Sequence, residues 1–319
     1  MVCWFFVGAD PCVRPRVVNG EIVRQQPRRM VAKSTTNLRG YWRGLLVIRR
    51  GGPMCPPVQL INRGVKIMRI GISGVGGKMG GRIAVLASEE KDLTIGAALE
   101  DVSSPVIGKK LSEIIEHSGL DVVVSMDVEK VCGEIDCLID FTSPSASLKC
   151  LDVCRRKGVA MVIGTTGFTK EEEDKILLGA KKIPIVFSPN MAIGVNVLFS
   201  IVESAARVLN DNFDIGIDET HHVHKKDSPS GTAKMIAKVI FDAAGETIPI
   251  KAEREGEVVG RHGIVFENKY EKLEIRHNAE SRDVFAAGAI KAAKFVFGKK
   301  PGLYSMRDVL GLTSGRLVG

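Results

Sequence analysis

The chain of 319 residues lacks a long apolar segment, because no apolar run reaches the roughly 18 residues that a membrane-spanning helix needs. Acidic residues are nearly absent from residues 1–66, which contain 12 Lys and Arg but only Asp10 and Glu21. The remaining 253 residues contain 33 Lys and Arg and 35 acids, so the net charge of +8 belongs to the N-terminal extension. The near-neutral body does not favour binding to nucleic acid, which would have to depend on the extension alone.

Residues 1–66 also lack sustained periodicity, and they combine Arg pairs with scattered Gly and Pro. Three interpretations remain open. The segment is an artefact of a start codon placed too early, because Met68 stands where the first strand is expected; it is a transit peptide, because it is rich in Arg and poor in acids; or it is a basic binding arm. In each case we expect residues 1–66 to be disordered rather than to pack as a domain.

The seven cysteines do not form the pattern of a disulfide framework. Cys150 and Cys154 are four residues apart on an expected helix and could share a metal ion. No second pair of ligands accompanies them, so we expect a pair of buried thiols instead. The cysteine pattern therefore predicts a reducing compartment and no metal.

A strand, a glycine turn and a helix are predicted at the start of the near-neutral body. Residues 68–73 are β-prone, and apolar residues at helical spacing begin at Ile83. Glycines between them allow a tight turn and let a pyrophosphate approach the helix N-terminus. The spacing of Gly74, Gly77 and Gly80 differs from the standard GxGxxG and is only a moderate signal by itself. The strand before the glycines and the helix after them strengthen the assignment. The predicted cofactor-binding residues here are Gly74, Val75, Gly76, Gly77, Lys78 and Met79.

A second expected strand, residues 93–99, ends at Glu100. An acid at this place binds the adenosine ribose hydroxyls in dinucleotide enzymes, although Glu100 lies beyond the usual ~20 residues from the first glycine. Asp101 follows, and a second acid would repel the 2′-phosphate of NADPH. We therefore predict that NADH is accepted at least as well as NADPH. The alternative is that Glu100 marks only a solvated strand end.

Further strand-like runs at residues 122–125, 137–141, 159–163 and 183–187 alternate with helical patterns. This alternation predicts a parallel sheet with helices on both faces. Ligands bind at the C-terminal ends of such strands, where small and hydroxylic residues let a cofactor approach the backbone. The candidates at these ends are Gly164, Thr165, Thr166, Ser188, Pro189, Asn190 and Met191.

The pattern changes after residue 191, where a helix at 194–210 precedes an alternating strand at 213–219. Two more strands are expected at 263–267 and 272–276, before a closing helix from about 283. We expect an α/β protein with a Rossmann-like parallel-sheet domain at 67–191, completed by about 283–319. A smaller α+β substrate-binding domain is expected at 192–282.

Residues 219–233 carry the most distinctive pattern, with His221, His222, His224 and two lysines crowded into six positions. Ser230 follows as a predicted N-cap, with Gly231 and Thr232 in the first helical turn. Free N–H groups there, with the helix dipole, make an anion site beside proton donors, which suits an acidic substrate. The alternatives are a solvated basic loop and a zinc site, the latter disfavoured because no second cluster of ligands is present.

Residues 67–312 resemble the family of 4-hydroxy-tetrahydrodipicolinate reductases, also called dihydrodipicolinate reductases, of the diaminopimelate and lysine pathway. The matching segments are collinear, and the histidine–lysine block with Pro-Ser-Gly-Thr-Ala at 229–233 is the most specific. The segments are residues 74–80, 97–100, 139–142, 162–168, 188–191, 194–196, 219–225, 229–233, 281–282 and 306–310.

The resemblance implies NADH- or NADPH-dependent reduction of a cyclic imine dicarboxylate after loss of its 4-hydroxyl group as water. It implies that His221 and Lys225 are catalytic and that His222, Gly231 and Thr232 bind the substrate. We favour Lys225 as the acid, because its charge also attracts the dicarboxylate. The resemblance further implies a cytoplasmic bacterial enzyme, with a plastid as the alternative, and a homotetramer assembled through the second domain.

Two features depart from the family pattern. Asp101 stands where many members carry a basic residue, which weakens the case for NADPH. The segment 254–262 is short, since the family usually has an extra strand and loop there, so tetramer formation and completeness of the substrate pocket are in question. Two other functions stay open: an amino-acid dehydrogenase of the same plan, such as aspartate dehydrogenase, and a cofactor-binding protein without turnover.

Overall fold

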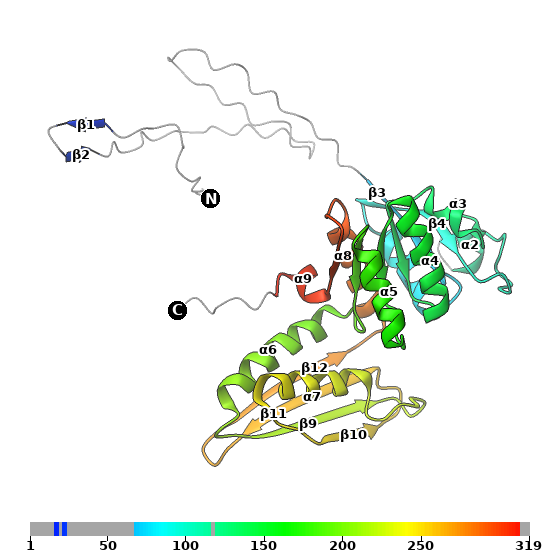
Figure 1. The fold of residues 1–319 in the computed structure, drawn as a ribbon. Helices are drawn as coiled ribbons and strands as arrows, with labels where there is room; N and C mark the ends of the chain where they lie inside the picture. Colours follow the sequence, from blue (N-terminus) through cyan, green and yellow to red (C-terminus); the bar gives the residue numbers. More distant parts are fainter. Residues whose placement is uncertain (1–15, 19–20, 24–66, 116–118, 313–319) are drawn as a thin grey trace, which may run out of the picture. The chain divides into compact units, whose positions relative to one another are not determined.

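The computed structural model describes residues 67–115 and 119–312, together with two short strands near the N-terminus (Figure 1). The chain divides into two units, residues 1–62 and 63–319. In the first unit, β1 (Arg16–Val18) pairs with β2 (Glu21–Val23) as an antiparallel hairpin. The expectations for the rest of the N-terminal extension lie outside the described residues.

The second unit contains two sheets. The first is a parallel sheet of seven strands in the order β13-β8-β7-β6-β3-β4-β5. Strands β6 and β7 are buried along their whole length because helices cover both faces. This confirms the predicted Rossmann-like sheet. The strands are β3 (Met68–Ser73), β4 (Leu93–Leu99), β5 (Val124–Ser125), β6 (Cys137–Asp140), β7 (Ala160–Ile163), β8 (Pro184–Phe187) and β13 (Gly302–Tyr304).

Helices pack on the two faces of this sheet to form two separate apolar cores. One core contains buried residues of α1 (Lys78–Ser88), α8 (Asp283–Val296) and α9 (Met306–Leu310). The other contains buried residues of α3 (Val128–Cys132), α4 (Pro144–Lys157) and α5 (Lys170–Ala180). The short α2 (Leu111–Ile114) precedes β5. Helix α8 and strand β13 show that the chain returns to the first sheet after building the second.

The second sheet is a mixed sheet of four strands in the order β10-β9-β11-β12. It contains β9 (Asp214–His221), β10 (Ile250–Arg254), β11 (Gly260–Glu267) and β12 (Lys272–Ala279). Helices α6 (Ile193–Leu209) and α7 (Gly231–Ala244) cover one face, as Figure 1 shows, and bury Ile217, Ile264 and Phe266. The parallel pair β9–β10 is joined through α7, and the histidine loop follows the C-terminal end of β9, an inner strand of this sheet.

The structure departs from the sequence expectations in two places. Strands β10 and β13 were not expected, because β10 is largely polar and β13 has only three residues. Cys150 and Cys154 are both buried free thiols, as expected, and each contacts a different partner: the Cys154 Sγ atom lies 3.5 Å from that of Cys132, and Cys150 contacts Ser73. Side chains four residues apart on a helix start 5–6 Å apart, so a neighbouring helix can supply a closer partner. None of the described helices has the length and apolar character needed to cross a membrane.

Candidate active site

The glycine turn after β3 brings the N-terminus of α1 against the strand end. Gly74 has φ 77°, a conformation that favours glycine, and its carbonyl accepts a hydrogen bond from Gly77 N at 3.0 Å. Gly80 packs so closely on the turn that a Cβ atom there would lie 2.1 Å from Gly74 O. Gly76, Gly77 and Lys78 are exposed residues at the helix N-terminus, which fits the approach of a pyrophosphate.

Glu100 lies at the end of β4, directly beside the glycine turn. Its Oε1 atom accepts a hydrogen bond from Gly76 N at 2.6 Å, so the acid and the turn are in direct contact. The adjacent Asp101 carboxylate accepts hydrogen bonds from both the N and Oγ atoms of Ser103. These bonds lower the pKa of Asp101, which keeps a negative charge next to Glu100 at neutral pH.

Asp140, at the end of β6, was not singled out in the sequence although it supports the neighbouring loops. It is fully buried and accepts hydrogen bonds from Ser147, Thr142 and Thr165. Burial raises its pKa, against the effect of these donors. Thr165 also accepts a bond from Thr142 N, so Asp140 fixes two strand-end loops together. An acid inside an apolar strand was the available signal.

The loop after β8 connects the nucleotide-side residues to the histidine side. Asn190 Nδ2 donates to Thr232 Oγ1 at 3.0 Å, and Ser188 Oγ donates to the Asn190 carbonyl. Met191 is buried, whereas Pro189 and Thr166 are exposed. The predicted cofactor residue Asn190 and the predicted substrate residue Thr232 are therefore in direct contact.

Ser230 caps α7 as predicted, because its side chain accepts a hydrogen bond from Ala233 N at 3.1 Å. Gly231 and Thr232 form the first turn, with Gly231 exposed. In the loop before it, Lys225 Nζ lies 2.8 Å from Asp227 Oδ1, and the Lys225 side chain is 22% exposed. A partly exposed lysine in the loop that leads into a helix N-terminus can both attract a carboxylate and deliver a proton.

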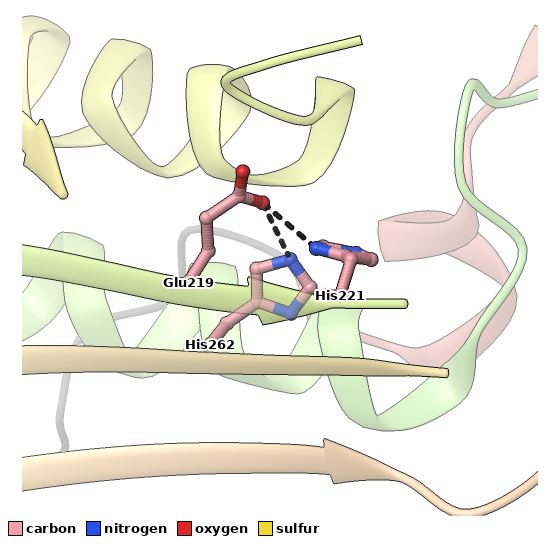
Figure 2. A group of neighbouring side chains, drawn as sticks. All are labelled: Glu219, His221 and His262. Atoms are coloured by element: carbon pink, nitrogen blue, oxygen red, sulfur yellow. Dashed lines mark ion pairs between the residues drawn. The ribbon is translucent and has the colours of Figure 1, made fainter. Parts of the chain in front are cut away.

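His221 is buried at the end of β9, next to a carboxylate that the sequence analysis did not assign. Its Nδ1 atom lies 3.1 Å from Glu219 Oε2, and the same oxygen lies 3.9 Å from His262 Nε2 (Figure 2). Burial lowers the pKa of His221, while the Glu219 charge acts in the opposite direction. His224, in contrast, is exposed and faces Glu257, so only part of the histidine cluster is buried.

A cavity of about 550 Å³ is lined both by a predicted cofactor-binding residue and by a predicted substrate-binding residue. The cavity is lined by Lys78 of the glycine turn, by His222 of the histidine loop and by Arg282. The full lining is Lys78, Arg82, His222, Glu257, Val259, Glu280, Ser281, Arg282 and Asp283. A larger cavity of about 750 Å³ lies around Phe213 and Tyr270, at the opposite end of β9 from His221, and its lining contains none of the predicted residues.

A glycine turn in contact with an acid at the end of the next strand, with a histidine–lysine loop beside a second sheet, is the arrangement of a nicotinamide-dependent oxidoreductase. Two family models match in tandem: "Dihydrodipicolinate reductase, N-terminus" at residues 68–191 and "Dihydrodipicolinate reductase, C-terminus" at 194–310. The chain therefore belongs to the dihydrodipicolinate reductase family.

Individual relatives agree with the family models. The 4-hydroxy-tetrahydrodipicolinate reductase of Dechloromonas aromatica is 44% identical over 266 residues, covering 76% of this chain and 98% of the relative. That of Syntrophotalea carbinolica is 40% identical and covers 77% and 100%. The dipicolinate-bound dihydrodipicolinate reductase from Paenisporosarcina sp. TG-14 is 26% identical with a TM-score of 0.65, covering 75% and 97%. These matches do not favour the alternative of another amino-acid dehydrogenase.

The comparison also bears on the shortened segment. The alignment with the Syntrophotalea enzyme spans 266 residues, but 77% of 319 residues is about 246, so about twenty residues of the relative have no counterpart here. In the structure β10 ends at Arg254 and β11 begins at Gly260. A direct connection of this kind fits the shortened segment that the sequence predicts at 254–262.

Proposed function

We propose that this protein reduces 4-hydroxy-tetrahydrodipicolinate, by way of dihydrodipicolinate, to tetrahydrodipicolinate with NADH or NADPH in lysine and diaminopimelate biosynthesis. The observation that carries this proposal is the loop from His221 to Ser230, in which Lys225 is partly exposed and pairs with Asp227 just before the chain enters the N-terminal turn of α7. Asn190 joins that turn to the nucleotide side through Thr232. A dicarboxylate held there faces both a proton donor and the predicted cofactor residues.

Each half of the chain has a defined part in the proposed reaction. Residues 67–191, completed by 283–319, bind the dinucleotide, with the pyrophosphate at the turn 74–79 and the adenosine ribose at Glu100. When bound, the nicotinamide supplies the hydride. Residues 192–282 bind the substrate: the first turn of α7, with Gly231 and Thr232, holds a carboxylate together with His222. Lys225 supplies the proton that completes the reduction, and His221 stabilises the site as an acid/base group.

The deciding assay follows NADH and NADPH oxidation with substrate made in situ by the preceding synthase from pyruvate and aspartate semialdehyde. Rapid oxidation with this substrate, and none with aspartate-derived imines, is expected. If the folded protein binds NADH but does not oxidise it with any substrate tested, the result would support a binding protein without turnover. Reduction of NAD⁺ with aspartate as the substrate would support the dehydrogenase alternative.

The proposed cofactor preference predicts a defined response to removal of the Asp101 charge. NADH is proposed to be used at least as well as NADPH because the ionised Asp101 repels a 2′-phosphate. Asp101→Asn keeps the side-chain shape and is expected to raise the NADPH/NADH ratio of kcat/KM by several-fold to about tenfold. Asp174→Asn on α5 is the control and leaves the ratio unchanged. An unchanged ratio in Asp101→Asn would show that the acid does not face the cofactor.

We also propose the family's homotetramer and a cytoplasmic location for this chain. The four described cysteines are all free and buried, which supports a reducing compartment. The short connection between β10 and β11 gives the proposed tetramer less support than the cytoplasmic location has. Light scattering on the purified full chain would decide it, since a monomer or a dimer contradicts the proposed tetramer.

A further inference from the structure

We propose that Glu219 is the positioning residue of this site, a buried carboxylate that holds the His221 ring, the Lys225 loop and the carboxylate-binding turn of α7 in register. The inference rests on the proposed function for the identity of the reaction. Glu219 lies on β9, is fully buried, and has both carboxylate oxygens turned towards groups of the site.

The Oε1 atom of Glu219 holds the backbone of the site. It accepts a hydrogen bond from Ser230 N at 3.0 Å, which fixes the residue that caps α7. It also lies 3.4 Å from Arg254 Nη1, and Arg254 Nη2 donates to the Asp227 carbonyl at 2.6 Å. Because the Asp227 side chain pairs with Lys225, Glu219 and Arg254 together anchor the loop that carries the proposed acid.

The Oε2 atom of Glu219 faces two buried imidazoles. His221 Nδ1 lies at 3.1 Å and His262 Nε2 at 3.9 Å, as Figure 2 shows. Neither Oε2 nor His221 Nδ1 has an aligned hydrogen bond in the described structure, although both are buried. Catalytic hydrogen bonds often tighten only when the substrate binds. A carboxylate at this place fixes the tautomer with a proton on Nδ1 and stabilises the imidazolium form.

The same three side chains have the donor set of a zinc site, with their donor atoms within 4.8 Å of one another. The remaining neighbours argue for positioning instead. Oε1 is already engaged by Ser230 and the Arg254 guanidinium, and the charges of Lys225 and Arg254 act on His221 in the sense that disfavours another cation. The carboxylate therefore balances positive groups of the protein itself.

Removal of the Glu219 charge is expected to change how His221 titrates. The charged and titratable groups that act on His221 are Glu219, Lys225, Asp227, Arg254 and His262. Glu219 and Asp227 raise its pKa and Lys225 and Arg254 lower it, so loss of the Glu219 charge leaves the lowering groups in excess. The protonated form of His221 would then persist only at lower pH.

The test is Glu219→Gln in the full chain, with Glu253→Gln on the exposed side of β10 as the matched control. Ser230 N and His221 Nδ1 face different carboxylate oxygens, and an amide replaces one of these oxygens by a donating NH₂ group, so one of the two partners loses its acceptor. We expect kcat/KM to fall by about 10²–10³-fold, as when orienting carboxylates are removed from histidines elsewhere. Dipicolinate binding is expected to weaken, NADH affinity to stay unchanged, and ¹⁵N NMR to show a lowered His221 pKa with loss of the Nδ1–H tautomer. Glu253→Gln is expected to match the wild type throughout.

A Glu219→Gln variant that keeps wild-type kcat/KM and the wild-type tautomer would overturn the proposal. If that variant does not fold, Arg254→Gln takes its place, because the Arg254 side chain is 21% exposed. It is expected to lower kcat through the Lys225 loop while NADH binding persists; unchanged kcat would also overturn the proposal. If the wild-type protein shows no turnover, only the proposed function is contradicted. The role of Glu219 is still tested by the NMR and dipicolinate-binding measurements, which need no reaction.

Discussion

Lys225→Ala is expected to lower kcat by about 10²–10⁴-fold, the usual contribution of a positioned general acid. The substitution removes the group that completes the reduction after hydride transfer, and with it a positive charge that attracts the dicarboxylate. KM should therefore rise as well. Stopped-flow and steady-state oxidation of NADH with substrate made in situ measure both effects.

The adjacent Lys226→Ala is the matched control, because Lys226 is exposed in the same loop and has the same charge. If attraction of the substrate by loop charge were the whole effect of Lys225, both variants would lose the same amount, and through KM. A large loss in kcat confined to Lys225→Ala identifies the proton donor. Equal, small effects in the two variants would return the role of acid to His221.

Regular local patterns made much of the fold predictable from the sequence. The β-prone run before Gly74 and the helical spacing from Ile83 allowed the nucleotide turn to be located, and the Ser230 cap followed from local side-chain chemistry. Glu100 was placed correctly at the end of β4 because it directly follows the β-prone run at residues 93–99. These features depend on residues that are near one another in the sequence, and for that reason they can be predicted from one sequence.

The features that were missed depend on pairings distant in the sequence. Strand β10 is largely polar, and its partner β9 lies about thirty residues earlier, so only the tertiary pairing reveals it. Glu219 and His262 are register partners on β9 and β11, and that pairing alone brings their side chains together. Asp140 is likewise explained by Thr165, which lies in the loop after β7. A strand pattern indicates which face a residue occupies but does not identify its neighbour.

Gly80→Ala is expected to damage the nucleotide site through the backbone alone. A Cβ atom at Gly80 would lie 2.1 Å from Gly74 O and 2.6 Å from both Gly74 C and Val75 Cα. These are backbone atoms of the turn, so α1 must move away from β3. Overpacking of this kind costs about 1–3 kcal/mol, which corresponds to a melting temperature lower by roughly 2–12 °C. Because the helix N-terminus and the exposed turn would separate, NADH affinity should fall at least about tenfold.

The neighbouring Gly81→Ala separates this effect from a general change in the helix. At Gly81 a Cβ atom would meet Ile115 Cγ2 at 3.4 Å and Val75 O at 3.6 Å, which is ordinary contact. Alanine there adds up to about 1 kcal/mol of helix propensity, so stability should be kept or raised and NADH affinity unchanged. If the two variants bind NADH equally, the close approach of α1 to the turn is not what holds the cofactor, and the pyrophosphate must be bound elsewhere at the strand ends.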